Sequence, residues 1–328
     1  MLNELGSKLR TALSAGLVGA CAVLGPTTAQ ADTNIAGKKV IFVPISMGIS
    51  LTEGWARRMR EHAAIYGYTI DVRDAAFNTG AMSELLAKAI SEKPDLLVVH
   101  NPTVQLLARQ IKQAEADGIK VLQVNLQSNQ PSTAFVGANW QRIGREIAED
   151  IVKECGKDSG KSGKVAIIPG QLTAADSVIM NEAAFKVFDQ HPEINVVSNQ
   201  ASDWEPEKAR QITATVLQQH PDLCAIFGHW DVHTMGAGNA VKDAGKADSV
   251  LVYSTGGGDS LACKAVEDGV QDRIWSYDAD GQGRDLGTMI DLLLQGAVRA
   301  DGSMLTIESP MKIIKAGDAY SADLCWKM

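Results

Sequence analysis

The chain alternates short β-branched apolar runs with longer segments of helical periodicity, and this alternation constrains its fold more than any other feature. The first run, KKVIFVPIS at residues 38–46, lies between Gly37 and Gly48. The segment after it, LTEGWARRMREHAAIYG, has apolar residues at helical spacing and ends at Gly67, as is typical of a helix C-cap. Apolar runs bounded in this way predict strands buried on both faces of a sheet.

The strand–helix pattern continues through IKVLQVNL at residues 119–126 and starts again with the long helical segment WQRIGREIAEDIVKECG at residues 140–156. Strands and helices that alternate with short links build parallel sheets, so the sequence predicts an α/β fold of two Rossmann-like lobes with doubly wound parallel sheets. The length of 328 residues agrees with two lobes, because a single core rarely grows so large. Ligands of such sheets bind at the carboxyl ends of the strands, which places the expected site in a cleft that the two lobes share.

The first 31 residues have the layout of a secretory signal peptide. Lys8 and Arg10 precede a small-residue apolar stretch, and AQA at residues 29–31 forms an A-x-A cleavage site before Asp32. A buried N-terminal helix is the alternative, whereas a transmembrane helix needs a longer apolar run. We therefore expect an exported protein.

Four cysteines follow the predicted signal peptide, at Cys155, Cys224, Cys263 and Cys325. An even number in an exported chain permits two disulfides, and the sequence does not choose among the possible pairings. Four unpaired thiols, buried as small apolar side chains, are the alternative.

Composition and motifs exclude several classes of function. The net charge is −8 and no long Lys/Arg run is present, so we predict no nucleic-acid partner. The chain has no G-x-S-x-G elbow, no G-x-x-x-x-G-K-[ST] loop and no C-x-x-C pair. We therefore predict no catalytic residue, no cofactor and no metal site. The glycine-rich turn at residues 255–259 is interpreted as a tight turn that leaves room for a ligand.

Polar and aromatic side chains gather where the predicted strands end. Amides and carboxylates exchange hydrogen bonds with hydroxyl groups, and Trp and Tyr faces pack on the C–H faces of a ring or polyol. This composition, with little Lys or Arg, favours a neutral, hydroxyl-rich small molecule. The candidate ligand-binding residues are Ser46, Met47, Ser50, Asn125, Gln127, Asp176, Trp204, Trp230, Asp231, Asp259, Tyr277 and Asp278.

Five segments carry a resemblance to a known family: KPDLLVVHNPT at 93–103, ADGIKV at 116–121, GANWQRIG at 137–144, ASDWEPEKA at 201–209 and HPDLCAIFGHWD at 220–231. With these segments the chain resembles the periplasmic sugar-binding proteins of ABC transporters, in the ribose-binding-like branch. The resemblance runs from about Lys38 to Lys315.

The resemblance implies a type I periplasmic binding protein, whose lobes are joined by a three-strand hinge with crossings near Asn139, Tyr277 and Ser309. The N-terminal lobe would comprise residues 38–139 and 278–308, and the C-terminal lobe residues 140–277 and 309–328. Such a protein is not an enzyme. It captures a neutral sugar or polyol in the cleft and delivers it to the permease of an ABC transporter. A chemoreceptor is a further expected partner, and a monomer is the expected state.

Two positions at which the family has arginines fall on Leu126 and near Ile179, and the family's Phe pair is also missing. These departures favour a different pentose, hexose or open-chain polyol over ribose.

The stretch HWDVH at residues 229–233 leaves alternatives open. His229, Asp231 and His233 suggest a metal-binding carrier, but an H-x-x-x-H pair needs helical geometry and His229 ends a predicted strand. The resemblance implies instead that Asp231 accepts hydrogen bonds from ligand hydroxyls and that Trp230 forms a wall of the pocket, with a core position for Trp230 as the alternative. A third hypothesis is an exported carbohydrate-active enzyme in which Asp231 and Asp259 act as an acid/base pair.

Overall fold

The computed structural model describes residues 34–317 and 325–326. The predicted signal peptide at residues 1–31 lies outside them. No helix in the described part of the chain has both the length and the apolar character needed to cross a membrane.

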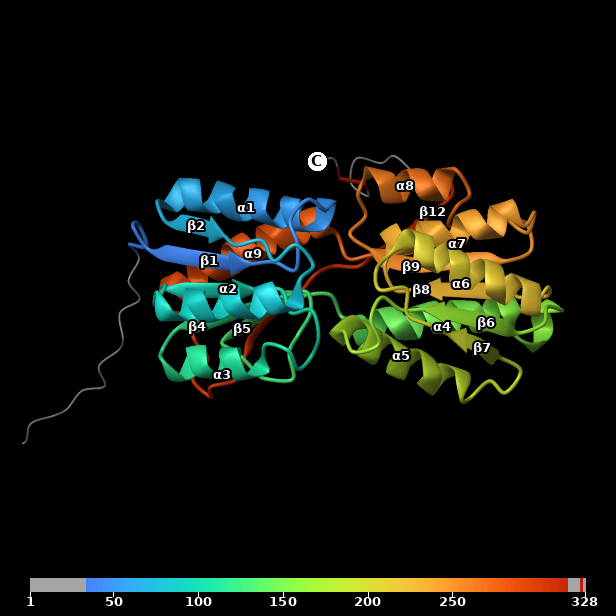
Figure 1. Cartoon of the computed structure of the whole chain (residues 1–328), viewed down its shortest axis with the longest axis horizontal. Helices are drawn as coiled ribbons and strands as arrows, with labels where there is room; N and C mark the ends of the chain where they lie inside the picture. The colour runs from blue at the N-terminus through green and yellow to red at the C-terminus, as the bar shows by residue number, and fades with distance from the viewer. Residues whose placement is uncertain (1–33, 318–324, 327–328) are drawn as a thin grey trace, which may run out of the picture. The chain divides into compact units, whose positions relative to one another are not determined.

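The first sheet has six strands, all parallel, and is flanked by helices on both faces (Figure 1). Alternate residues of its strands enter different cores. Phe42 packs in the same core as Trp55 of α1, whereas Ile41 packs with Leu86 of α2. In spatial order the strands are β11 (Leu305–Glu308), β5 (Ala134–Gly137), β4 (Lys120–Val124), β3 (Leu96–Val99), β1 (Lys39–Val43) and β2 (Thr69–Val72). The helices that pack on it are α1 (Ser50–Tyr66), α2 (Thr79–Ser91), α3 (Ala108–Ala116) and α9 (Ala279–Leu294).

The second sheet also has six strands and its own flanking helices. Gly144 lets α4 approach α5 closely, because a Cβ at this position would lie 2.6 Å from the carbonyl oxygen of Met180. In spatial order the strands are β12 (Lys312–Lys315), β10 (Arg273–Ser276), β9 (Leu251–Gly256), β8 (Ala225–Gly228), β6 (Lys164–Ile168) and β7 (Asn195–Asn199). Its helices are α4 (Trp140–Cys155), α5 (Ala175–Phe188), α6 (Pro206–Gln219), α7 (Asp231–Asp243) and α8 (Ser260–Glu267), with a 3₁₀ turn at Lys157–Ser159.

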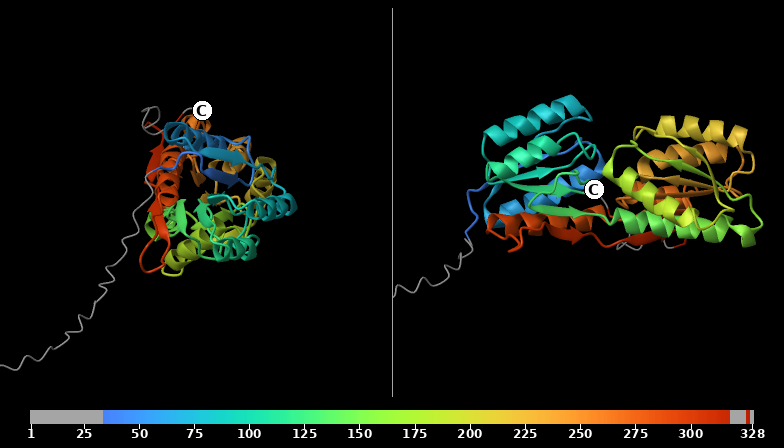
Figure 2. Two further views of the ribbon diagram at one scale, coloured as in Figure 1. Left: turned by 90° about the vertical axis from the view of Figure 1, so that its left-hand side faces the viewer. Right: turned by 90° about the horizontal axis from the view of Figure 1, so that it is seen from below.

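The chain passes between the two sheets three times, after β5, after β10 and between β11 and β12. The last passage is the segment drawn in red in Figure 2. These passages lie next to Asn139, Tyr277 and Ser309, which are the positions expected for the hinge. The residue boundaries of the two lobes stay a prediction.

The two sheets are mostly parallel, as predicted, and one strand runs in the opposite direction. β12 pairs antiparallel with β10, in a register that sets Arg273 opposite Lys315. The reason is that β12 follows β11 directly, without the helical crossover that returns a chain to the parallel direction. The strand periodicity also missed β5 and β11, each of four residues.

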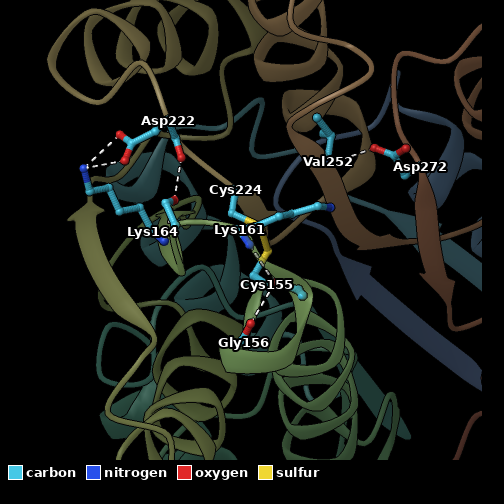
Figure 3. Close-up of a disulfide and its surroundings, with 10 residues drawn as sticks. Cys155, Gly156, Lys161, Lys164, Asp222, Cys224, Val252 and Asp272 are labelled. Carbon is cyan, nitrogen blue, oxygen red and sulfur yellow. Dashed lines mark hydrogen bonds and ion pairs between the residues drawn. A yellow bond between two sulfur atoms is a disulfide. The ribbon is translucent and has the colours of Figure 1, made fainter.

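Both disulfides that the cysteine count allows are present, as Cys155–Cys224 and Cys263–Cys325. The first joins the end of α4 to the residue before β8, beside the ion pair of Lys164 with Asp222 (Figure 3). It therefore lies at the amino end of β8. The four cysteines are not unpaired buried thiols, which was the alternative.

The second disulfide holds Trp326 beside the glycine-rich turn after β9. The indole Nε1 of Trp326 donates to the carbonyl oxygen of Gly257 at 2.9 Å. The ring also lies against α1, where a Cβ at Gly54 would come within 2.9 Å of the Trp326 Cη2 atom. A side chain at position 54 would displace this ring.

We expect both disulfides to stabilise the fold mainly by restricting the conformations that are open to the unfolded chain. Cys155 and Cys224 are 69 residues apart, and closing a loop of that length is worth about 4 kcal/mol in the chain-entropy model. The variant Cys155→Ala/Cys224→Ala should lose a free energy of unfolding of that order in urea titrations. A reducing agent should lower the free energy of unfolding of the wild type more than that of the variant. An unchanged free energy of unfolding would contradict this account.

Candidate functional site

A cavity opens at the carboxyl ends of the strands, and residues attached to both sheets line it. The space between its walls amounts to about 480 Å³, which includes a part open to solvent. The location agrees with the rule for open α/β sheets. The lining residues are Ile45, Ile49, Leu51, Phe77, His100, Asn125, Leu126, Trp140, Asp176, Trp204, His229 and Trp230.

Two tryptophans at the ends of β7 and β8 form one wall. The rings of Trp204 and Trp230 lie edge to face with their centroids 6.1 Å apart. His233 supports both from behind, at 5.6 Å and 6.3 Å, and its Nε2 lies 3.1 Å from the carbonyl oxygen of Ile168. Gly170 is required at its position because a Cβ there would collide with the Trp204 ring. These contacts fix an aromatic surface, and they exclude a core position for Trp230.

Asp176 supplies the only carboxylate among the residues that line the cavity. It is the second residue of α5 and is 2% exposed. Its Oδ1 has no hydrogen-bond partner in the described part of the chain. Burial raises the pKa of this carboxyl group to about 7, against the opposing effect of backbone N–H groups at the start of the helix. The carboxyl group of Asp176 can therefore accept a hydrogen bond at the cavity, and its charge near neutral pH depends on the groups that surround it.

Two buried histidines add further unpartnered groups. His100 follows β3 and packs edge to face on Trp55 at 5.0 Å, while His229 follows β8 and lies 4.8 Å from the ring of Phe227. Neither ring nitrogen of either side chain has a partner among the described residues. Burial lowers the pKa of each to about 3, so both imidazoles are neutral at pH 7. A neutral imidazole both donates and accepts.

Asn125 connects the cavity to all three passages between the sheets. Its carbonyl oxygen accepts from Nε1 of Trp140 at 2.8 Å, and its Oδ1 accepts from Nε2 of Gln282 at 3.2 Å. Gln282 also donates to Oγ of Ser309 at 3.1 Å. The ring of Tyr277 packs edge to face on Trp140, with the ring centroids 5.3 Å apart. Asn125 adopts a left-handed φ of 58°, which Asn tolerates better than most residues.

The opposite wall is mainly aliphatic and comes from the first sheet. Ile45, Ile49 and Leu51 follow β1, and Leu126 follows β4. Phe77 completes this side and is 53% exposed. The cavity thus has an aliphatic side and an aromatic, acidic side.

Of the twelve candidate residues, the structure brings Asn125, Asp176, Trp204 and Trp230 to the cavity. Trp140, His100 and the apolar residues after β1 were missed as ligand-binding candidates. His100 directly follows β3, and this position could have identified it as a candidate. Nothing in the sequence of the apolar residues distinguishes a cavity wall from a core.

Asp231, Asp259 and Tyr277 lie behind the cavity and do not line it. Asp231 packs on Gly256, where a Cβ would collide with its carboxylate. Asp259 caps α8 through its Oδ1, which accepts from the amides of Leu261 and Ala262. Tyr277 is buried against Trp140, with ring centroids 5.3 Å apart.

Burial, followed by the neighbouring charge of Asp259, raises the pKa of Asp231 to about 8. The three glycines after β9 make room for side chains of this protein, because Gly256 meets Asp231, Gly257 meets Ala279 and Gly258 meets Ser276. None of these glycines is among the described residues that line the cavity, and the interpretation of this turn as space for a ligand stays a prediction.

The remaining candidates also lie outside the lining. Ser46 donates to the carbonyl oxygen of Met47, and the amide of Met47 donates to Asp74. Ser50 begins α1, and Gln127 is half-buried after β4. Asp278 caps α9 and pairs with Lys312 at 3.2 Å. A role in ligand binding for these residues stays a prediction.

The HWDVH stretch does not form a metal centre in this geometry. His229 follows β8 and lines the cavity, whereas His233 lies in α7 and turns to the carbonyl oxygen of Ile168. Within residues 34–317 and 325–326, no three His, Cys, Asp or Glu side chains are placed to hold a metal ion. The stretch instead contributes one histidine and one tryptophan to the cavity.

Residues 40–297 match the model of the periplasmic binding protein domain. This match covers more than half of the chain, which therefore belongs to the periplasmic binding protein domain family.

Relatives of known function extend over most of the chain. A ribose import binding protein of Bacillus subtilis is 23% identical, over 92% of this chain and 95% of its own length. A D-ribose/D-allose-binding protein of Pseudomonas aeruginosa is 26% identical over 74% of this chain and 78% of its own. Among solved structures, a carbohydrate transporter solute-binding protein of Agrobacterium radiobacter in complex with D-arabinose superposes with a TM-score of 0.78 at 14% identity, covering 88% and 98% of the two chains.

The left-handed turn at Asn125 should be sensitive to substitution in two separable ways. Asn125→Gly keeps the backbone conformation and loses the side-chain hydrogen bonds, whereas Asn125→Ala loses both. We expect the Ala variant to have a free energy of unfolding about 1 kcal/mol lower than the Gly variant, because a left-handed residue with a Cβ costs about that much. Chemical denaturation of both variants measures the difference. Equal stability would show that the backbone is not constrained here.

Proposed function

We propose that this protein is a periplasmic solute-binding protein that captures a small sugar or polyol and delivers it to the permease of an ABC transporter. The observation that carries the proposal is the solvent-connected cavity at the carboxyl ends of strands from both sheets. Unpartnered groups of Asp176, His100 and His229 belong to its lining. Buried polar groups without partners are costly, so their presence in a cavity favours a ligand that supplies the missing hydrogen bonds.

Relatives named for the ribose, allose and apiose that they bind support the sugar class. Export through an N-terminal signal peptide belongs to this proposal, and both disulfides suit an oxidising compartment. We propose a monomer, with a chemoreceptor as a second partner.

The arrangement favours binding over catalysis. An acid/base pair for glycoside cleavage must flank the reacting bond. Asp231 and Asp259 are 4% and 7% exposed and lie outside the cavity lining, so neither faces a ligand held there.

A thermal-shift screen of the protein against pentoses, hexoses and polyols tests the ligand class. A ligand at about 1,000 times its dissociation constant should stabilise the fold by roughly 4 kcal/mol, which raises the melting temperature by several degrees. No shift with any member of the panel would contradict the sugar or polyol assignment.

Trp204→Ala should weaken binding of the sugar or polyol found in that screen. An aromatic side chain central to a binding site is worth about 2 kcal/mol, or roughly thirtyfold in affinity. Leu292→Ala is the control, because Leu292 lies on α9, is exposed and does not line the cavity. Titration calorimetry on the wild type and both variants gives the affinities. Unchanged binding by Trp204→Ala would place the ligand elsewhere.

A further inference from the structure

The charges around the cavity are all of one sign. Asp176 lines it, and Asp231 and Asp259 lie behind it, all three buried. The hydroxyl of Tyr277 lies among them: burial first, and then the negative potential of the three carboxylates, raise the pKa of Tyr277 well above its usual value. No Lys or Arg lines the cavity, and in the described part of the chain no ion pair joins any of the three carboxylates to a cation.

Asp176 is the member of this group that a ligand can reach. Its Oδ1 is buried and unpartnered at the cavity. A buried carboxylate is strongly destabilised unless a proton or a cation neutralises it. The protein supplies backbone N–H groups but no cationic side chain. A positively charged group on the ligand would complete this site.

The aromatic wall favours the same kind of ligand. Trp140, Trp204 and Trp230 line the cavity together with Asp176. Indole faces carry negative potential and attract ammonium groups, most strongly where water is excluded. The neutral rings of His100 and His229, which also line the cavity, can donate to and accept from hydroxyls, and Ile49 and Leu51 offer surface to C–H groups.

We propose that the ligand is a hydroxylated amine, an amino sugar or amino polyol whose ammonium group binds Asp176 beside the three tryptophans. This inference rests on the proposed solute-binding function and narrows its ligand class. It replaces the neutral ligand that the strand-end residues favoured, because the cavity retains a carboxylate and lacks a cation to balance it.

Matched pairs of ligands provide the test. Titration calorimetry at pH 7.5 compares glucosamine with glucose, galactosamine with galactose, and 1-amino-1-deoxysorbitol with sorbitol, together with a panel of neutral pentoses, hexoses and polyols. We expect at least one amine to bind about tenfold or more tightly than its neutral partner, because one charge-assisted contact changes affinity by roughly tenfold to a hundredfold.

The variant Asp176→Asn keeps the size of the side chain and removes its charge. It should abolish the difference in affinity between the amine and its neutral partner, because an amide can exchange hydrogen bonds with hydroxyls but cannot form an ion pair with an ammonium group. Asp222→Asn is the matched control, since it removes a carboxylate outside the cavity, in the turn before β8, where Asp222 forms an exposed ion pair with Lys164. If a neutral sugar binds as well as its amine, or Asp176→Asn keeps the preference, the amine inference fails and the proposed function stands. If no sugar, polyol or amine of the panel binds, the proposed function fails as well.

The pH dependence of the wild type tests the inference without a variant. The amine should bind to the ionised form of Asp176. Because the pKa of this group is about 7, most of it is protonated below neutral pH. Asp231, whose pKa is about 8, also gains negative charge as the pH rises, which favours the ammonium group in the same way. His100 and His229 have pKa values of about 3 and stay neutral between pH 5.5 and 8. Tyr277 and His233 also stay neutral there.

For an amine whose own pKa lies well above 8, affinity should therefore rise roughly thirtyfold from pH 5.5 to pH 8, with protons released on binding at pH 7. Affinity that is constant or falls over this range would overturn the inference.

Discussion

The arrangement of the cavity depends on one residue in a left-handed turn. Asn125 follows β4 and accepts hydrogen bonds from Trp140 through its carbonyl oxygen and from Gln282 through its side chain. These partners lie beside the passages between the sheets, and Gln282 extends the network to Ser309 at the third. A hydrogen-bonded network of this kind ties the floor of the cavity to the connections between the lobes. Since the network is buried, loss of one member leaves its neighbours without partners.

Much of the fold could be predicted from the sequence because helices and strands alternate with clear periodicities. The errors occur where that alternation stops. β5 and β11 have four residues each and pair with one another at the edge of the first sheet. Neither fits the alternation of strands and helices, because no helix separates β4 from β5 or β11 from β12. The direction of β12 depends on a connection that the sequence pattern does not describe.

The position of the site could be predicted from the sequence, but most of the residues that line the cavity could not. The ends of the strands are the right place, and Asn125, Asp176, Trp204 and Trp230 were found there. Whether a polar side chain enters the cavity depends on the other hydrogen bonds that it can form nearby. Asp259, for example, is used as a helix cap, and an acceptor used in that way does not turn to the ligand.

The order of strands along the chain has a consequence for synthesis. Each sheet receives its last strand from the C-terminal region: β11 completes the first sheet and β12 the second. A polypeptide that emerges from the ribosome N-terminus first therefore holds two unfinished sheets until residue 315 has been made. Folding of both lobes is then a late event that follows translation of nearly the whole chain. For a protein that we propose is exported, this delay favours a chain still unfolded when it meets the translocation machinery.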